Sequence, residues 1–363
     1  MNIKNVSYAF ISMILLPICL ILRFFSKNNR CFFYSPLGLK GNIKYLHEFY
    51  KRKGEECYFI DPIKLNLKGF LKLNIELSRA KVIFLTHGIG KLPLICFLIP
   101  RIQLWHGFPL KKILLNSDVD TKKFKSELLN YIFKVIYRFR IYISYTYLVT
   151  SDSLLGHELI DSFGFNKQKV LLLGSPSQER AEIVKCKKNN SSFRILYLPT
   201  WRDGSDRIFD ILSEFISEID DCFCKENRIE MDIKLHPYDM QKNKYKALNN
   251  SECITIINND IEDMIDFYSN YQCLITDYSS ACFEFAPVSN KVIFYVPDFQ
   301  QYINDRGFTV DINLLFNGRE VTNIEQLKMA LLEVNNNDRY TFDYVNYVGK
   351  SNECNELIYE KFH

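Results

Sequence analysis

CLITDYSSACFEFA, residues Cys273–Ala286, predicts a buried strand that runs through a polar turn into a helix. The apolar run at its start has the character of a strand end, and the residues from Ala281 onward are compatible with a helix. A strand that enters a helix through two serines brings backbone N–H groups, hydroxyls and the positive end of a helix dipole to one point, which favours phosphate. The same residues are also typical of a helix cap without a ligand, and this stretch alone favours the cap.

Predicted strands and helices alternate on both sides of this stretch. In the first half, the predicted strands are Cys31–Ser35, Cys57–Ile60, Lys81–Gly88, Leu148–Ser151 and Val170–Leu173, and the helices are Asn42–Lys53 and Leu154–Phe163. In the second half, the strands are Arg194–Leu198, Glu230–Leu235, Cys253–Ile257 and Val292–Tyr295, and the helices are Ile208–Ile219 and Ile261–Tyr268. This alternation predicts an α/β fold of two Rossmann-like parallel-sheet domains that face a cleft, joined by the polar stretch 185–192.

Length and composition agree with two globular domains. The chain has 363 residues, of which 47% are hydrophobic and 24% charged, so each domain can bury a core. A net charge of +4 gives no reason to expect a nucleic-acid partner. The 11 cysteines are scattered without metal-binding spacing, which predicts reduced thiols, a cytosolic compartment and no metal site.

The N-terminal residues predict contact with a membrane. Val6–Leu22 carries no charge and lies at the short end for a membrane span, and basic residues follow it. No small-x-small cleavage site follows, which argues against a signal peptide. We therefore expect residues 1–30 to form a membrane anchor or an interfacial helix, with a hydrophobic core helix as the alternative.

A basic block lies between residues 101 and 150, which contain nine Lys and Arg residues but only three Asp and Glu residues. Within it, Thr121–Ser144 is expected to form a basic, aromatic helix that lies on an anionic membrane surface, or else a solvated face over an apolar core. The apolar run Leu92–Ile99 fits either a membrane-dipping segment or buried packing.

Four polar loops follow four of the predicted strands, at WHGFP (105–109), PTWRD (199–203), KLHP (234–237) and TDYSS (276–280). Ligands of open parallel sheets bind at the carboxyl ends of the strands, where these loops lie. An imidazole such as that of His106 titrates near neutral pH and can accept a proton from a hydroxyl. A histidine that merely satisfies the core is the alternative reading.

These motifs, in this order, resemble those of the CDP-glycerol glycerophosphotransferase family, which builds teichoic acids and related capsule or surface polymers. The resemblance covers about residues 31–335 and includes the ELIDSFG helix at 158–164 and the DRGF turn at 305–308. It implies a GT-B-like fold in which residues 31–187 face the acceptor and the membrane, residues 188–340 bind the nucleotide, and residues 341–363 form a C-terminal tail or helix.

The resemblance also implies the reaction and the residues that carry it. Glycerol phosphate would pass from CDP-glycerol to a hydroxyl of an undecaprenyl-diphosphate-linked saccharide at the cytoplasmic face of the membrane, and CMP would be released. His106 would be the general base, and His236 would contact the diphosphate and ease the departure of CMP. The implied donor- and phosphate-binding residues are Thr200, Arg202, Asp277, Ser279, Ser280 and Glu284, and the implied acceptor-side turn comprises Trp105, Gly107, Pro109 and Lys111. No cofactor is implied, and the use of a divalent cation stays open.

Some residues depart from the family pattern. Phe108 replaces the usual Thr, Glu284 replaces the usual Asp, and GSPSQE at 174–179 stands where the family has GYPRND. Leu314–Asn317 lacks the usual Pro-Gly. Three alternatives therefore stay open: a CDP-ribitol-dependent ribitol-phosphate transferase, a GT-B glycosyltransferase that uses a nucleotide sugar, and a non-catalytic, membrane-associated assembly protein.

Overall fold

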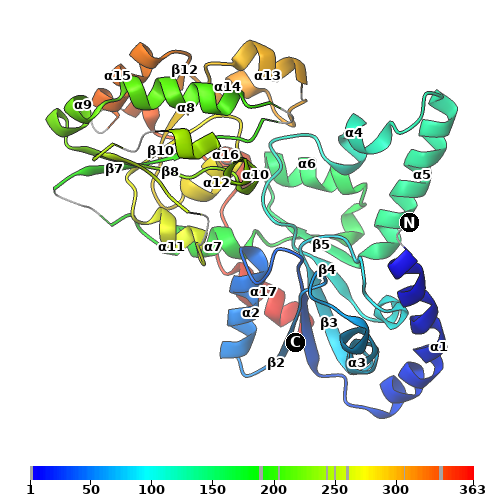
Figure 1. The fold of residues 1–363 in the computed structure, drawn as a ribbon. Coiled ribbons are helices and arrows are strands. Elements are labelled where there is room, and N and C mark those ends of the chain that lie inside the picture. The colour runs from blue at the N-terminus through cyan, green and yellow to red at the C-terminus, as the bar shows by residue number, and fades with distance from the viewer. Residues whose placement is uncertain are drawn as a thin grey trace. The chain divides into compact units, whose positions relative to one another are not determined.

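The structure is a computed structural model that describes residues 3–187, 191–202, 205–242, 244–248, 251–258, 261–305, 307–334 and 338–363, with the backbone alone at 3–7 and 303–305 (Figure 1). Residues 188–190 of the expected linker, Asp203 and Arg306 lie outside the described residues. The chain forms two compact units. The first contains Met1–Gly107, Ile113–Glu179 and Gly349–His363, and the second contains Phe108–Lys112 and Arg180–Val348.

The first unit is built on a six-stranded parallel sheet with the order β2-β1-β3-β4-β5-β6. Its strands are β1 (Arg30–Tyr34), β2 (Glu56–Ile60), β3 (Ala80–Leu85), β4 (Arg101–Gln103), β5 (Tyr147–Thr150) and β6 (Val170–Leu172). Its helices are α1 (Ile3–Phe25), α2 (Asn42–Arg52), α3 (Leu67–Leu77), α4 (Asp118–Thr121), α5 (Glu127–Ser144), α6 (Leu154–Phe163) and α17 (Cys354–Phe362), and α7 (Pro176–Ile183) begins in it. The strand order reverses between β1 and β3, which makes this point the switch of the sheet.

Helices cover both faces of this sheet, which explains why its central strands β1 and β3 are mostly apolar. Phe32 and Tyr34 pack on the side of α3, whereas Cys31 and Phe33 pack on the side of α2 and α17. Successive side chains of a strand point to opposite faces, so a sheet that is buried on both sides requires an uninterrupted apolar run.

The C-terminal helix α17 returns to the first unit and lies beside α2 (Figure 1). Ile358 is buried in the core there, and the ring of Tyr359 lies 5.1 Å from that of Tyr50. The backbone N–H of Asn355, at the start of α17, donates to the carboxylate of Glu179. Glu179 is the last residue of the first unit before the chain enters the second unit at Arg180. The expected C-terminal helix is α17, and residues 349–363 belong to the first unit, where they complete one face of its sheet.

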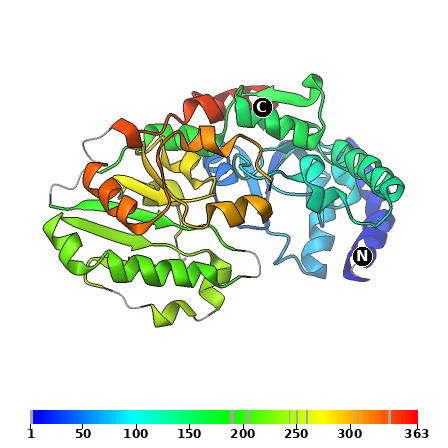
Figure 2. The same cartoon turned by 90° about the horizontal axis from the view of Figure 1, so that it is seen from above.

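The second unit is also built on a six-stranded parallel sheet, with the order β12-β11-β10-β7-β8-β9. Its strands are β7 (Phe193–Leu198), β8 (Ile229–Ile233), β9 (Ile254–Ile256), β10 (Cys273–Thr276), β11 (Lys291–Tyr295) and β12 (Glu320–Val321). Its helices are α8 (Arg207–Glu218), α9 (Asp221–Glu226), α10 (Pro237–Gln241), α11 (Met264–Tyr268), α12 (Ala281–Phe285), α13 (Phe299–Asp305), α14 (Ile312–Phe316), α15 (Ile324–Glu333) and α16 (Val345–Val348). Helix α8 packs along one face (Figure 2), and the switch point lies between β7 and β10.

The apolar N-terminal residues form one long helix, α1. The window Tyr8–Phe25 is long and apolar enough to cross a membrane, and only 11% of it is buried. One seam of α1 packs on α3, where the Ser12 hydroxyl donates to the Asn74 side chain at 3.1 Å and the Cys19 thiol donates to the Asn74 carbonyl at 3.2 Å. The low burial shows that α1 is not a core helix, since most of its apolar surface faces outward.

The expected helix Thr121–Ser144 is wrong in extent. It is divided into α4 and α5, and Lys122, Lys123 and Lys125 lie between them. The side chain of Asn130 accepts hydrogen bonds from the backbone of Lys123 and Phe124, and Ser126 caps α5. These side-chain bonds replace the helical bonds of the connecting segment. The run Leu92–Ile99 contains a short 3-10 helix, Leu94–Leu98, in which Ile95 and Cys96 are fully buried.

Candidate active site

The WHG loop follows β4 in the first unit and is held by two buried polar side chains. Trp105 has a φ of 53°, in the left-handed region that a non-glycine residue adopts only at a cost of about 1–3 kcal/mol. Its N–H donates to the Gln103 side chain at 2.9 Å, and its carbonyl accepts from the Asn42 amide at 3.1 Å. The backbone on both sides of the strained peptide is therefore fixed, and His106 follows it directly.

The hydrogen bond made by His106 determines which of its nitrogens is free. Its Nδ1 lies 3.2 Å from the carbonyl oxygen of Thr86. A carbonyl only accepts, so Nδ1 carries the hydrogen, and in the neutral ring the lone pair is on Nε2. Desolvation by the surrounding atoms lowers the pKa of His106 despite the hydrogen bond to Thr86, which keeps the ring neutral at pH 7. His106 can therefore accept a proton at Nε2.

Asn42 connects this loop to the segment that departs from the family pattern. Its side-chain oxygen accepts hydrogen bonds from the Ser175 hydroxyl at 2.7 Å and from the Ser177 backbone and hydroxyl at 3.0 and 2.6 Å. Its amide also donates to Leu104. Where the expected arginine is missing, the chain thus has a buried polar cluster that reaches the WHG loop.

The remaining residues of the expected acceptor-side turn follow His106. Gly107 has a φ of 145°, which favours glycine, and the next five residues, Phe108–Lys112, belong to the second unit. There the Pro109 carbonyl accepts from the Thr309 hydroxyl at 2.7 Å, and the Lys111 ammonium lies 5.2 Å from the Tyr302 ring centre. Pro109 and Lys111 therefore belong to the second unit, whereas His106 belongs to the first.

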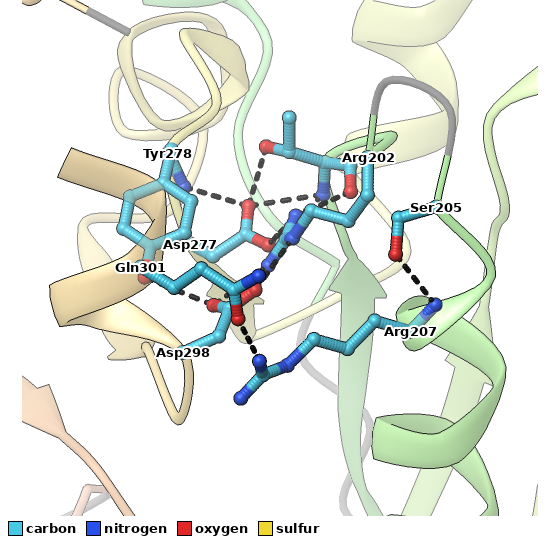
Figure 3. A network of polar contacts seen from close by, with 8 residues as sticks. Arg202, Ser205, Arg207, Asp277, Tyr278, Asp298 and Gln301 are labelled. Atoms are coloured by element: carbon cyan, nitrogen blue, oxygen red, sulfur yellow. Dashed lines mark hydrogen bonds and ion pairs between the residues drawn. The ribbon is translucent and has the colours of Figure 1, made fainter. Parts of the chain in front are cut away.

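In the second unit, Arg202 and Asp277 meet at the switch point between β7 and β10 (Figure 3), and Thr200 contacts Asp277 there. The Arg202 guanidinium lies 2.9 Å from the Asp277 carboxylate, and the Thr200 N–H donates to the same carboxylate at 3.0 Å. Asp298, which follows β11, accepts from Arg202 Nε at 2.8 Å and from the Tyr278 hydroxyl at 3.0 Å. All of these side chains except Thr200 are buried.

In this buried network, Arg202 and Asp277, which the sequence analysis gave as donor-binding residues, form an ion pair with each other. Burial alone lowers the pKa of Arg202, but Asp277 and Asp298 together raise it above its ordinary value. Both carboxylates face the one guanidinium (Figure 3), so the groups stabilise the turn that precedes Ser279. Sequence reasoning missed Asp298, although a carboxylate three residues beyond a buried strand is a signal that could have found it.

Ser279, Ser280 and Glu284 follow this turn. The Ser279 hydroxyl accepts from the Ala281 N–H at 3.2 Å, whereas the Ser280 side chain makes no capping bond to α12. Glu284 is half-buried on α12, and burial raises its pKa to about 7. The structure therefore does not use the Ser280 hydroxyl to cap α12.

His236 carries its hydrogen on the opposite nitrogen from His106. Its Nδ1 accepts from the backbone N–H of Tyr238 at 3.3 Å, so in the neutral ring Nε2 bears the hydrogen and donates. Burial, helped by Lys234 and Lys111, lowers the pKa of His236. The Trp201 ring stacks on it at 5.9 Å. One histidine therefore offers a lone pair and the other offers an N–H.

Two parallel-sheet α/β units, each with polar groups at the switch point of its sheet, define a protein of GT-B-like fold, and the switch points are where such sheets bind their ligands. The chain belongs to the CDP-glycerol:poly(glycerophosphate) glycerophosphotransferase family, whose model matches residues 20–351. The family and the fold expected from the sequence are thus confirmed.

Several curated proteins are similar to this chain. A teichoic acid poly(glycerol phosphate) polymerase of Bacillus subtilis (strain 168) is 25% identical over 270 residues, which are 65% of this chain but 33% of that protein. A teichoic acid glycerol-phosphate primase of the same strain is 28% identical over 239 residues, 62% of this chain and 58% of the primase. The chain therefore spans a third of the polymerase and over half of the primase.

Among solved structures, the wall teichoic acid polymerase TagF matches with a TM-score of 0.70 at 16% identity, covering 100% of this chain and 98% of that one. At this level of sequence identity, the match shows that the two chains share a fold and shows nothing about a shared function. Among the residues that the structure describes, no group of three or more His, Cys, Asp or Glu is placed to hold a metal ion.

Proposed function

We propose that this protein transfers glycerol phosphate from CDP-glycerol to a hydroxyl of an undecaprenyl-diphosphate-linked saccharide and releases CMP, in the synthesis of teichoic acid, capsule or a related surface polymer. Family membership supports the donor and the class of reaction. The observation that carries the assignment of roles is the complementary state of the two motif histidines, because His106 offers a lone pair at Nε2 and His236 offers an N–H at Nε2.

In this proposal the acceptor hydroxyl oxygen forms a bond to the phosphorus that bears glycerol, and the bond from that phosphorus to the bridging oxygen of CMP breaks. The hydroxyl proton moves to Nε2 of His106. The bridging oxygen leaves with its electron pair, and the Nε2 hydrogen of His236 stabilises the charge that develops on the diphosphate oxygens. Ser279 and Ser280 bind the phosphates.

We further propose that the protein works at the cytoplasmic face of the membrane. The outward face of α1 exposes Phe10, Ile14, Ile18, Ile21, Phe24 and Phe25. Helix α5 exposes Leu128, Ile132, Val135, Ile136 and Phe139 among its basic side chains. Exposed apolar faces of this size mark interaction surfaces, and basic residues beside them favour anionic lipid.

The test is CMP release from CDP-glycerol by the full chain with a lipid-linked saccharide acceptor, with CDP-ribitol and UDP-sugars as alternative donors. A teichoic acid ribitol-phosphate primase of Bacillus spizizenii is 25% identical over 187 residues, which is why ribitol is included. We expect CMP from a CDP-polyol and no transfer from UDP-sugars, and the rates with EDTA and with Mg²⁺ show whether a divalent cation takes part. His236→Ala should lower both turnover and donor affinity. Sugar transfer without CMP release would overturn the proposal, and the absence of any donor binding would favour an assembly role.

A further inference from the structure

A second histidine lies against His106 in the first unit. His87 follows β3 at the switch point of the sheet, and its half-buried ring stacks on that of His106 with 4.5 Å between ring centres and 10° between ring planes. The Trp105 ring contacts His106 at 4.2 Å from another direction. None of the motifs that carry the proposed reaction includes His87.

The structure holds His87 by both its backbone and its side chain. Its carbonyl accepts hydrogen bonds from the Gln103 amide at 3.2 Å and the Tyr145 hydroxyl at 3.4 Å, and its Nδ1 lies 2.9 Å from the Thr86 hydroxyl. Thr86 therefore contacts both imidazoles, His87 through its hydroxyl and His106 through its carbonyl. One buried residue sets the orientation of the two stacked rings.

We propose that His87 is a positioning residue, whose ring holds the His106 imidazole in place and stabilises the imidazolium that forms when His106 accepts the acceptor's proton. This inference rests on the proposed function. Two stacked rings cannot both be charged without repulsion, so the pair works only if one of them stays neutral. Burial and the neighbouring His106 lower the pKa of His87 to about 4, which leaves His87 neutral at pH 7.

A cation over the face of a neutral aromatic ring is attracted by the ring electrons. For a partly desolvated pair this attraction corresponds to a rate difference of roughly five- to thirtyfold if it acts in the transition state but not in the ground state. The effect should appear in kcat rather than in the KM for CDP-glycerol, because His87 contacts the base and not the donor.

The matched variants are His87→Phe and His87→Leu, since both fill the site but only Phe presents an aromatic face. We expect His87→Leu to lower kcat about five- to thirtyfold with KM for CDP-glycerol unchanged, and His87→Phe to stay within about threefold of the wild type. With six histidines in the chain, ¹³C-histidine NMR should show the ring-current shift of the His106 signals kept in His87→Phe and lost in His87→Leu.

Equal kcat for the Leu and Phe variants would overturn the proposal, as would an unchanged His106 shift in His87→Leu. If His87→Leu fails to fold, Thr86→Val removes the hydroxyl that orients His87 and keeps the carbonyl that binds His106, and it should lower kcat with KM unchanged; an unchanged kcat would count against the inference. A wild type that releases no CMP would refute the proposed function instead, and the NMR comparison would still test the stacking.

Discussion

Removing the Asp298 carboxylate should destabilise the second unit strongly. Asp298 is 5% exposed and accepts three hydrogen bonds, from Arg202 Nε at 2.8 Å, from Arg202 Nη2 at 3.1 Å and from the Tyr278 hydroxyl at 3.0 Å. In Asp298→Ala the guanidinium, which is 6% exposed, keeps only Asp277 as its charged partner. Breaking a buried ion pair by removing one partner costs about 3–5 kcal/mol, because the other partner stays buried with unmet hydrogen bonds.

The assay is urea unfolding followed by tryptophan fluorescence. The chain has two tryptophans, so a Trp105→Phe background leaves Trp201, which lies next to Arg202, as the reporter of the second unit. Asp298→Ala should lower the free energy of unfolding of this unit by about 3–5 kcal/mol, and Asp298→Asn by less, since the amide oxygen still accepts. Asp210→Ala, at an exposed carboxylate on α8, is the matched control and should change it by less than about 0.5 kcal/mol.

A loss below about 1 kcal/mol in Asp298→Ala would refute the reasoning, because a network that holds the turn cannot be removed at so small a cost. Weaker CDP-glycerol binding without any loss of stability would mean instead that Asp298 and Arg202 contact the donor.

Other variants test the remaining assignments. Ser280→Ala should weaken CDP-glycerol binding by about 1.5–3 kcal/mol in calorimetry, since it removes a hydrogen bond to a charged group; unchanged affinity would exclude Ser280 from the phosphate site. His106→Ala should lower turnover by roughly 10²–10⁴-fold with donor affinity kept, and lost affinity with turnover kept at saturation would contradict its role as base. Because the pKa of Glu284 is raised from 4.5 to about 7 in the fold, the folded state retains a proton that the unfolded chain releases, so this carboxyl loses about 1–3 kcal/mol of stabilisation between pH 4.5 and 7. His87, whose pKa is lowered to about 4, acts in the opposite direction, so the measured quantity is the difference from Glu284→Gln. In urea titrations at each pH, the free energy of unfolding of the wild type should fall by about 1–3 kcal/mol relative to that of Glu284→Gln, and a constant difference would contradict the raised pKa. Replacing Phe24 and Phe25, which are 83% and 80% exposed, by serine should reduce binding to anionic vesicles in flotation assays and leave the melting temperature unchanged; a lower melting temperature would mean that they pack against protein.

The agreement between expected and observed elements follows from local patterning. β1, β7 and β10 were found within one or two residues, because apolar runs between polar turns report burial on both sheet faces. The bounds of α2, α6 and α8 also agree with the expected helices within one residue, whereas the basic helix before Ser144 was expected to be continuous and is interrupted by capping residues. Ser126 carried that signal, but a single serine within an amphipathic pattern is easily overlooked.

Local sequence patterns were sufficient to predict the two-sheet fold, the family and the positions of the polar loops, because strand burial and turn chemistry are properties of neighbouring residues. Which of those polar groups meet depends on the packing of the whole chain. Arg202 pairs with Asp298 across 96 residues, Asn42 reaches Trp105 across 63, and His87 stacks on His106 although a whole strand separates them. Each contact depends on the order of the strands in the sheet, β2-β1-β3-β4 in the first unit and β11-β10-β7-β8 in the second. Hydrophobic periodicity is the same for any strand order, so it carries no record of which loops lie side by side.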